Sequence, residues 1–290
     1  MENVAGFLFI SPWLARFFLY EAGPVLAAMY LSLTNYDLLT GADFTGLRNY
    51  QLMFGRDPLF WHTLRITAIY SVVGVLLQTL LGIALALLLN ARIRGITVYR
   101  TIFYLPSVVS GVAVSYMWLW VLNPEGGILN TLLSYVGIVG PNWLFSLEWA
   151  LPTFILMSLW GLGGGMILYL AGLQGVSTEL YEAAALDGAG SWSKFWHITV
   201  PMISPVIFFN VVIGMINSFQ VFTGSYIMTR GGPANATLFY VLYLYRHAFE
   251  NFRMGYASAL AMVLFMIILS LTILSFRLSS RLVYYEGRSR

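Results

Sequence analysis

The chain has 290 residues, of which 59% are hydrophobic and only 9% are charged. A soluble domain carries about 25% charged residues, so this composition places the protein in a membrane. The formal net charge of +3 is small and dispersed, which argues against nucleic acid as a partner. The absence of cysteine excludes disulfides and thiolate chemistry, and three widely separated histidines argue against a histidine metal cluster.

Apolar segments long enough to cross the membrane recur along the chain. About 20 residues of α-helix span the roughly 30 Å of hydrocarbon. The first segment contains Arg16 and Glu21, which lie five positions apart and so point to different sides of a helix. We predict an all-α integral membrane protein with a single transmembrane domain over 1–290, whose six spans lie at about 6–33, 63–90, 99–122, 149–173, 201–228 and 254–277.

The orientation follows from lysine and arginine, which gather in short cytoplasmic loops. If both termini are cytoplasmic, the inner side holds eight basic residues and the outer side six. Arg92, Arg94 and Arg100 lie in one short connector between spans two and three on the inner side. The outer basic residues are matched by acidic ones. We therefore predict a multi-pass protein of a bacterial or archaeal inner membrane, with both termini in the cytoplasm.

The third span contains Pro106 and Gly111 and ends with Trp118 and Trp120. Tryptophan gathers at membrane interfaces. We therefore interpret these two side chains as part of an aromatic belt rather than as a stack for a ligand.

The fourth span contains the glycine-rich stretch WGLGGGMI, residues 160–167. A dinucleotide-binding fingerprint needs glycines that follow a strand and open a helix, and this stretch lies inside an uncharged membrane segment, so we reject that interpretation. Gly161 and Gly165 leave one helix face without side chains, which suits close helix contact. A helix with several glycines also bends easily and can line a cavity with bare backbone, and both interpretations stand.

The fifth span places uncharged polar side chains at membrane depth, where unpaired hydrogen-bonding groups are costly. Asn210, Gly214 and Asn217 follow at i, i+4 and i+7, which forms one stripe of a helix. This stripe either joins helices through hydrogen bonds or forms a wall that accepts sugar hydroxyls beside aromatic faces.

A polar segment, ELYEAAALDGAGSWSKFWHITVP, separates spans four and five. Ser177 or the threonine after it can cap a helix, and ELYEAAAL consists of strong helix formers. Gly188, followed by a second glycine, can end this helix in the left-handed conformation. Ser191 can start a second short helix before Pro201, which suits the first turn of span five. These residues alone are compatible both with an interfacial amphipathic helix and with a protein docking element.

The same segment carries a longer motif. EAA at 182–184 is followed after three residues by Gly188, and after nine more by Ile198 and then Pro201. This resembles the EAA loop of permeases from binding-protein-dependent ABC importers, in which leucine is usual at the position of Val200. The resemblance extends over nearly the whole chain to sugar permeases of the carbohydrate-uptake class, which includes maltose, lactose and glycerol-phosphate systems. It is carried by FTGLRNY, YRTIFYLPSVVSG, NPEGGILN, AGLQGVSTELYEAAALDGA and GGPANAT.

The resemblance implies the type I ABC importer permease fold, with a cytoplasmic coupling loop over 177–200. Such a loop docks into a groove on a cytoplasmic ATPase, where Glu182 would face a basic or polar partner. Small side chains would permit close approach, and the turn after the helix would fix its direction. The coupling residues implied in this way are Glu182, Ala183, Ala184, Asp187, Gly188, Ile198 and Pro201.

The resemblance also implies the partners. They are a second homologous permease, an ATPase dimer that binds ATP and Mg²⁺, and an extracytoplasmic sugar-binding protein that meets segments 34–62 and 229–253. The chain has no GxxxxGK[ST] motif, so we expect no enzyme activity and no cofactor in this subunit. By resemblance the sugar site lies near the middle of the membrane on spans four and five, at Trp160, Gly164, Asn210, Gly214, Asn217, Ser218 and Gln220.

Two other classes of membrane protein fit the residues less well. A secondary transporter uses intramembrane carboxylates, and only Glu21 in the first span is a candidate. A membrane-embedded enzyme needs clustered His, Asp or Glu at membrane depth, and the spans show none. Spans four and five contain no basic residue, which favours a neutral di- or oligosaccharide over the alternative of glycerol-3-phosphate or another polyol.

Overall fold

A computed structural model describes residues 2–37, 41–91 and 93–284, without the side chains of 2–8 and 280–282. Within these ranges the chain is helical, and its β pairing is limited to an isolated bridge between Thr34 and Phe44. This confirms the predicted all-α class. Three of the arginines used to predict orientation, Arg92, Arg288 and Arg290, lie outside the described residues.

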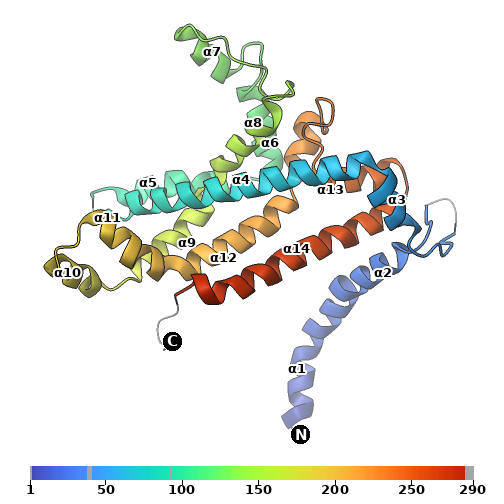
Figure 1. The fold of residues 1–290 in the computed structure, drawn as a ribbon, viewed down its shortest axis with the longest axis horizontal. Helices are drawn as coiled ribbons and strands as arrows, with labels where there is room; N and C mark the ends of the chain where they lie inside the picture. Colours follow the sequence, from blue (N-terminus) through green and yellow to red (C-terminus); the bar gives the residue numbers. More distant parts are fainter. Residues whose placement is uncertain (1, 38–40, 92, 285–290) are drawn as a thin grey trace. The chain divides into compact units, whose positions relative to one another are not determined.

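The chain divides into two compact units, and Figure 1 labels their helices. The first unit comprises Met1–His62 and Tyr243–Ser270, and the second comprises Thr63–Leu242 and Leu271–Arg290. Two long helices belong partly to each unit, α4 (Pro58–Leu89) and α14 (Met254–Leu282). The first unit also contains α1 (Glu2–Arg16), the π-helical turn η1 (Phe17–Ala22), α2 (Gly23–Leu31), α3 (Arg48–Arg56) and the π-helical turn η6 (Arg246–Glu250).

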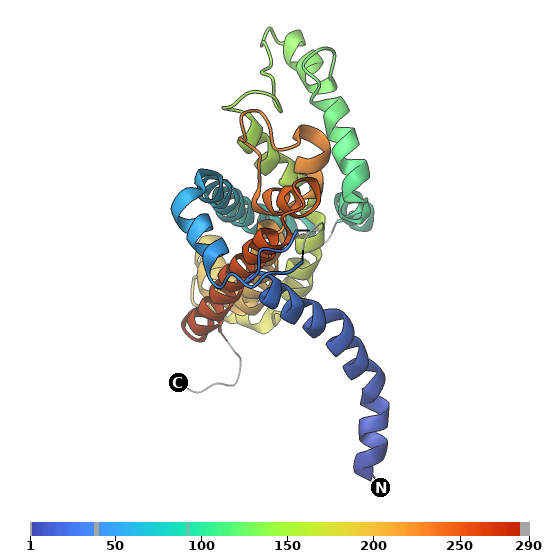
Figure 2. The ribbon, with the colours of Figure 1, turned by 90° about the vertical axis from the view of Figure 1, so that its right-hand side faces the viewer.

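The second unit contains most of the remaining helices. They are α5 (Ile96–Tyr104), η2 (Leu105–Val108), α6 (Gly111–Val121), α7 (Ile128–Tyr135), α8 (Ala150–Ser158), η3 (Leu159–Gly161), α9 (Gly163–Gln174), α10 (Thr178–Leu186), α11 (Ser191–Lys194), η4 (Phe195–Thr199), α12 (Val200–Phe219), η5 (Ser225–Thr229) and the start of α13 (Tyr240–Tyr245). Within this unit α6 and α7 project away from α9 and α12 (Figure 2).

Three helices of the described residues are long and apolar enough to cross a membrane, Pro58–Leu89, Ser191–Phe219 and Met254–Ser279. Two bent pairs bring the number to five if each pair is one span. The predicted first span, 6–33, is helical through α1, η1 and α2 but is interrupted by the π-helical turn. The six-span arrangement as a whole therefore stays a prediction.

Two of the predicted spans are not continuous helices, which corrects the sequence-based expectation. The segment 99–122 bends by 100° between η2 and α6, and 149–173 bends by 48° between η3 and α9. At the first break, Pro106 lies in the 3₁₀ turn and the Ser110 hydroxyl caps α6 by accepting a hydrogen bond from the Ala113 N–H at 3.4 Å. A proline and a new N-terminal cap end one helix and start another even in an apolar run.

The second unit has two clusters of buried apolar side chains. One joins Ile83 of α4, Tyr169 of α9 and Ile203 of α12. The other joins Ile66 of α4, Phe154 of α8 and Phe239. Trp118 is half-buried and packs against this second cluster, whereas Trp120 is 64% exposed, and their interpretation as an interface belt stays a prediction.

The first unit is organised around the Asp57 carboxylate. This side chain caps α4 by accepting hydrogen bonds from the backbone N–H groups of Leu59 (3.1 Å) and Phe60 (3.2 Å). It also accepts hydrogen bonds from the hydroxyls of Tyr243, at 2.5 Å, and Tyr256. One carboxylate thus joins the start of α4 to residues far away in the sequence.

His247 lies between the two tyrosines that bind Asp57. Its ring meets the rings of Tyr243 and Tyr256 edge to face, at centroid distances of 4.6 and 4.8 Å. Its Nδ1 is buried and makes no hydrogen bond within the described residues. Burial and the nearby Arg253 cation lower the pKa of His247 to about 4, against a smaller opposing effect of Asp57.

This lowered pKa predicts that the first unit loses stability in acid. Because an unfolded histidine has a pKa of 6.5, the unfolded state takes up a proton before the folded state does as the pH falls. The stabilisation is therefore complete above pH 6.5 and declines between pH 6.5 and 4, by no more than about 3 kcal/mol. Thermal unfolding of the purified protein at pH 7 and pH 5 measures this loss. His247→Phe keeps an aromatic ring without the proton, so it should reduce the pH dependence, and an unchanged pH dependence would contradict the assignment.

Candidate coupling segment and polar cavity

The helix α10 is defined by signals at both of its ends. At its start, the Ser177 hydroxyl accepts a hydrogen bond from the Glu179 N–H at 3.2 Å. At its end, Gly188 has a φ of +77°. The N–H of Gly188 donates to the Ala185 carbonyl at 3.1 Å, and the N–H of Ala189 donates to the Ala184 carbonyl at 2.8 Å. This pair of bonds is a Schellman motif, so the predicted start and end of the helix are confirmed.

One face of α10 is open to its surroundings. Glu182, Ala183 and Asp187 are exposed, Ala184 is half-buried, and Leu186 is 91% exposed. Neither Glu182 nor Asp187 forms an ion pair with another described residue. An acidic surface beside a large exposed leucine and small alanines has the chemistry of a docking surface for a basic and partly apolar partner.

The other face of α10 is fixed to the core of the second unit. The Tyr181 hydroxyl is hydrogen-bonded to the Thr199 hydroxyl at 3.0 Å. Tyr181, Phe195 and Ile198 pack against the buried cluster that joins α4, α9 and α12. Ile198 and Pro201 are half-buried, so these two motif residues lie at the anchor of the segment rather than on its open face.

The second short helix predicted to start at Ser191 is not a separate element. Helix runs without a break from Ser191 to Phe219, through α11, the π-helical turn η4 and α12. A proline ring collides with the carbonyl four residues before it, and a π-helical turn just before Pro201 gives that carbonyl more room. The predicted span 201–228 also ends earlier, at Phe219. The coupling segment is consequently a direct extension of α12.

A small polar cavity lies where α4, α9 and α12 meet. Its volume is about 50 Å³, space for water molecules at about 30 Å³ each and too little for a sugar ring. Asn210 and Gly214 of α12 face Gly161, Gly165 and Tyr169 across it, and the cavity is completed by Val75, Gln78, Thr79 and Leu162. The Asn210 amide N–H donates to the Val206 carbonyl at 3.0 Å. The Gln78 amide donates to the Ser158 carbonyl at 3.3 Å.

The other residues predicted for a sugar site lie in different surroundings. The Ser218 hydroxyl is hydrogen-bonded to Ser71 of α4, which is the helix-joining role. Trp160 is 46% exposed and meets Trp118 edge to face at 5.7 Å. Gly164 lies beside Ser107, and Asn217 and Gln220 are exposed.

Sequence reasoning missed three polar residues of the cavity, Gln78, Thr79 and Tyr169. Gln78 and Thr79 lie in the part of α4 over 72–89, which is otherwise apolar, and polar side chains at membrane depth were a signal for them. In the glycine-rich stretch, the structure assigns the two interpretations, cavity lining and close helix contact, to different glycines. Gly161 and Gly165 line the cavity, whereas the close helix contact is made by Gly163, whose Cα lies against the backbone of α5.

A comparison with known protein families shows to which family the chain belongs. Residues 78–283 match the family described as binding-protein-dependent transport system inner membrane component. The chain belongs to this family.

Several curated proteins resemble this permease over nearly their full length. It is 41% identical to a probable ABC transporter permease protein, YesP of Bacillus subtilis, over 99% of this chain and 94% of that protein. It is 36% identical to the lactose transport system permease protein LacF of Rhizobium radiobacter, over 99% and 95%. The trehalose/maltose transport system permease protein MalF of Thermococcus litoralis is 33% identical over 94% and 92%.

A solved structure has the same fold. A chain from the crystal structure of a bacterial alginate ABC transporter, in complex with an alginate pentasaccharide-bound periplasmic protein, superposes with a TM-score of 0.86. The alignment covers 97% of this chain and 95% of that one, at 24% identity. The fold predicted from the sequence, that of an ABC importer permease, is therefore confirmed.

Proposed function

We propose that this permease is one membrane subunit of an ATP-driven importer for a di- or oligosaccharide, coupled to its ATPase through α10. The relatives named for lactose and for trehalose and maltose support the sugar class. The observation that carries the proposal is the rigid connection between the exposed acidic face of α10 and the helices that line the polar cavity.

The connection has two routes. Helix α12 continues from the coupling segment without a break and carries Asn210 and Gly214 into the cavity wall. Helix α9 packs along α12, and both contribute to the buried cluster that holds Tyr181 and Ile198. A force applied to α10 by a partner is transmitted through this packed core, because close-packed interiors carry strain. Movement of α10 would thereby widen or close the cavity.

The chemistry of the cavity favours a neutral sugar. Its lining offers two amides and two hydroxyls, and none of its lining residues is charged. The Trp118 Nε1 is buried without a hydrogen-bond partner in the described part of the chain, and its ring lies against Trp160, which precedes the lining residue Gly161. Amides, hydroxyls and aromatic faces match sugar hydroxyls and C–H faces, whereas a phosphate would need a cation.

We also propose an orientation for the chain. The connector with Arg94, and the start of α5 with Arg100, lie at the same end as α10 (Figure 1). Because basic residues mark cytoplasmic loops, we propose that this end is cytoplasmic. The six predicted spans, four before this end and two after it, then put both termini on the same side. The ATPase dimer, which supplies the ATP and Mg²⁺ sites, docks here. Segments 34–62 and 229–253 then meet the extracytoplasmic sugar-binding protein, and a second homologous permease completes the pathway.

Asn210→Leu should reduce sugar uptake at least about tenfold, because it removes a polar wall group and fills the cavity with apolar volume. Uptake of labelled oligosaccharides by cells measures this, with the sugar that the unaltered transporter accumulates. Phe209→Leu is the matched control, since Phe209 neighbours Asn210 but is 54% exposed. Both variants should assemble normally. Unchanged uptake by the Asn210 variant would contradict the assignment of this side chain to the sugar pathway and would leave it as a helix-joining group.

A further inference from the structure

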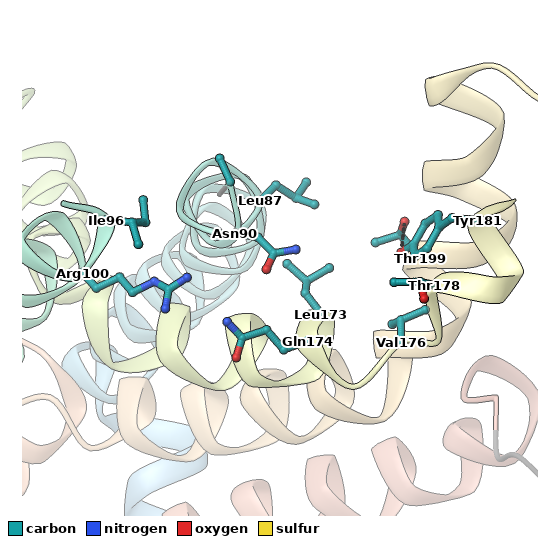
Figure 3. Close-up of a pocket in the computed structure, with 11 residues that line it drawn as sticks. Leu87, Asn90, Ile96, Arg100, Leu173, Gln174, Val176, Thr178, Tyr181 and Thr199 are labelled. Carbon is teal, nitrogen blue, oxygen red and sulfur yellow. Dashed lines mark hydrogen bonds between the residues drawn. The ribbon is translucent and has the colours of Figure 1, made fainter. Parts of the chain in front are cut away.

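A larger cavity lies at the root of α10, where the connector between α4 and α5 approaches α9 (Figure 3). Its volume of about 630 Å³ is within the range of about 300–1,000 Å³ that is usual for small-molecule sites. It is distinct from the polar cavity, and the proposed transport mechanism gives it no role. Figure 3 shows Asn90, Arg100 and Gln174 on one side and Thr178, Tyr181 and Thr199 on the other.

Arg100 is a fixed cation in this wall. Its Nε and Nη2 atoms donate hydrogen bonds to the Leu89 carbonyl at 3.2 and 2.8 Å, which holds the guanidinium at the end of α4. A guanidinium has five N–H donors, so these two bonds leave others for a ligand. Arg100 has no carboxylate within ion-pair distance among the described residues. The half-buried charge is therefore positioned but not neutralised.

Two amides add donors beside this charge. The side chains of Asn90 and Gln174 make no hydrogen bond with any described residue, and both line the cavity with Arg100. A carboxylate offers about four acceptor positions. The two amides and the guanidinium together present more N–H donors than that. A phosphate group has more acceptor oxygens, and arginine binds it with bidentate hydrogen bonds.

The other residues that line the cavity indicate the chemistry of the rest of the ligand. On the far side, the Tyr181 and Thr199 hydroxyls bind each other and Thr178 starts α10. Leu87, Ile96 and Leu173 supply apolar surface, and none of the lining residues is acidic. The cavity therefore suits a phosphate ester with an organic part that is both hydroxyl-bearing and apolar.

We propose that this cavity binds a phosphate ester, with the phosphate on Arg100, Asn90 and Gln174. The same chemistry is offered by the headgroup of an anionic phospholipid and by a soluble phosphorylated metabolite. An occupant bridges the α4–α5 connector and the root of α10. Its effect on coupling to an ATPase rests on the proposed function, whereas the binding itself does not.

The test uses the tagged full chain, purified from its native membrane with the subunits that accompany it. Retention of phosphatidylglycerol against phosphatidylcholine is measured by native mass spectrometry. Binding of glucose 6-phosphate is measured by equilibrium dialysis against glucose. Preference for phosphatidylglycerol identifies a lipid headgroup, and preference for glucose 6-phosphate identifies a soluble ester. Either preference supports the site. If the protein prefers neither phosphatidylglycerol over phosphatidylcholine nor glucose 6-phosphate over glucose, the proposal is overturned. Since no readout involves ATP hydrolysis or transport, the result is independent of the proposed function.

Three variants distinguish binding at this site from nonspecific binding through surface charge. Gln174→Leu leaves the Arg100 contact with Leu89 intact and should weaken binding of the preferred ligand about tenfold. Arg100→Gln should weaken it at least as much. Arg94→Gln removes the same charge from the connector just before α5, but Arg94 lies outside the cavity lining, so this variant should retain binding. Equal losses in Arg94→Gln and Arg100→Gln, or undiminished binding in Gln174→Leu, would overturn the proposal.

Discussion

Glu182→Lys is expected to abolish co-purification of the permease with its ATPase while leaving membrane insertion intact. The Glu182 carboxylate is exposed and unpaired within the described residues, on a helix whose other face is fixed by Tyr181. Because the Glu182 side chain makes no hydrogen bond or ion pair with a described residue, we expect the reversal to act on the partner alone. Loss of one member of a buried charge pair at an interface costs about 2–5 kcal/mol, and a like charge adds repulsion. Affinity should therefore fall more than about hundredfold.

The matched control is Glu148→Lys, which makes the same charge change at another exposed glutamate, outside the coupling segment. A pull-down through the tagged permease from detergent-solubilised membranes, followed by immunoblotting for the ATPase, measures both variants. The Glu148 variant should retain the ATPase. Full retention by the Glu182 variant would show that α10 does not dock through this residue.

Gly163→Ala is expected to cause the largest loss of stability among Gly→Ala substitutions in the glycine-rich stretch. A Cβ at this position would lie 2.7 Å from the Tyr104 Cα and closer still to the Phe103 carbonyl oxygen. Both are backbone atoms, so no side-chain rotation relieves the collision and α5 must move away from α9. Overpacking of this kind costs about 3 kcal/mol.

Gly161→Ala is the matched control, because a Cβ there meets nothing within 4 Å. This substitution should change stability by less than about 0.5 kcal/mol. Thermal unfolding of the two variants in the same detergent compares them directly. Equal unfolding midpoints would mean that the helices are not in backbone contact at Gly163.

Local signals allowed much of the coupling segment to be predicted from the sequence. Ser177 and Gly188 act through hydrogen bonds within a few residues of themselves, so the bounds of α10 could be predicted without knowledge of the fold. The apolar runs likewise predicted an all-helical membrane protein. An apolar run, however, predicts that a segment is long enough to cross the membrane, but not that its helix is continuous. The breaks in 99–122 and 149–173 arise from caps and turns inside those runs.

Contacts between helices were the part that sequence reasoning missed. Asn210 and Gly214 could be placed on one stripe, but the residues opposite them, Gln78 and Tyr169, come from helices far away in the chain. For the same reason Gly163, rather than Gly161, proved to be the glycine in contact with α5. Helical spacing predicts which residues share a face, whereas the neighbour of that face depends on how the whole bundle packs.

The most direct test of the central claim is co-purification from the native membrane, with the permease tagged and the accompanying proteins identified by mass spectrometry. An importer subunit that relies on partners should bring a cytoplasmic ATPase and a second, homologous permease in fixed stoichiometry. Recovery of the permease only as a homo-oligomer, without an ATPase, would contradict the account. It would favour a secondary transporter, with Glu21 as its coupling carboxylate.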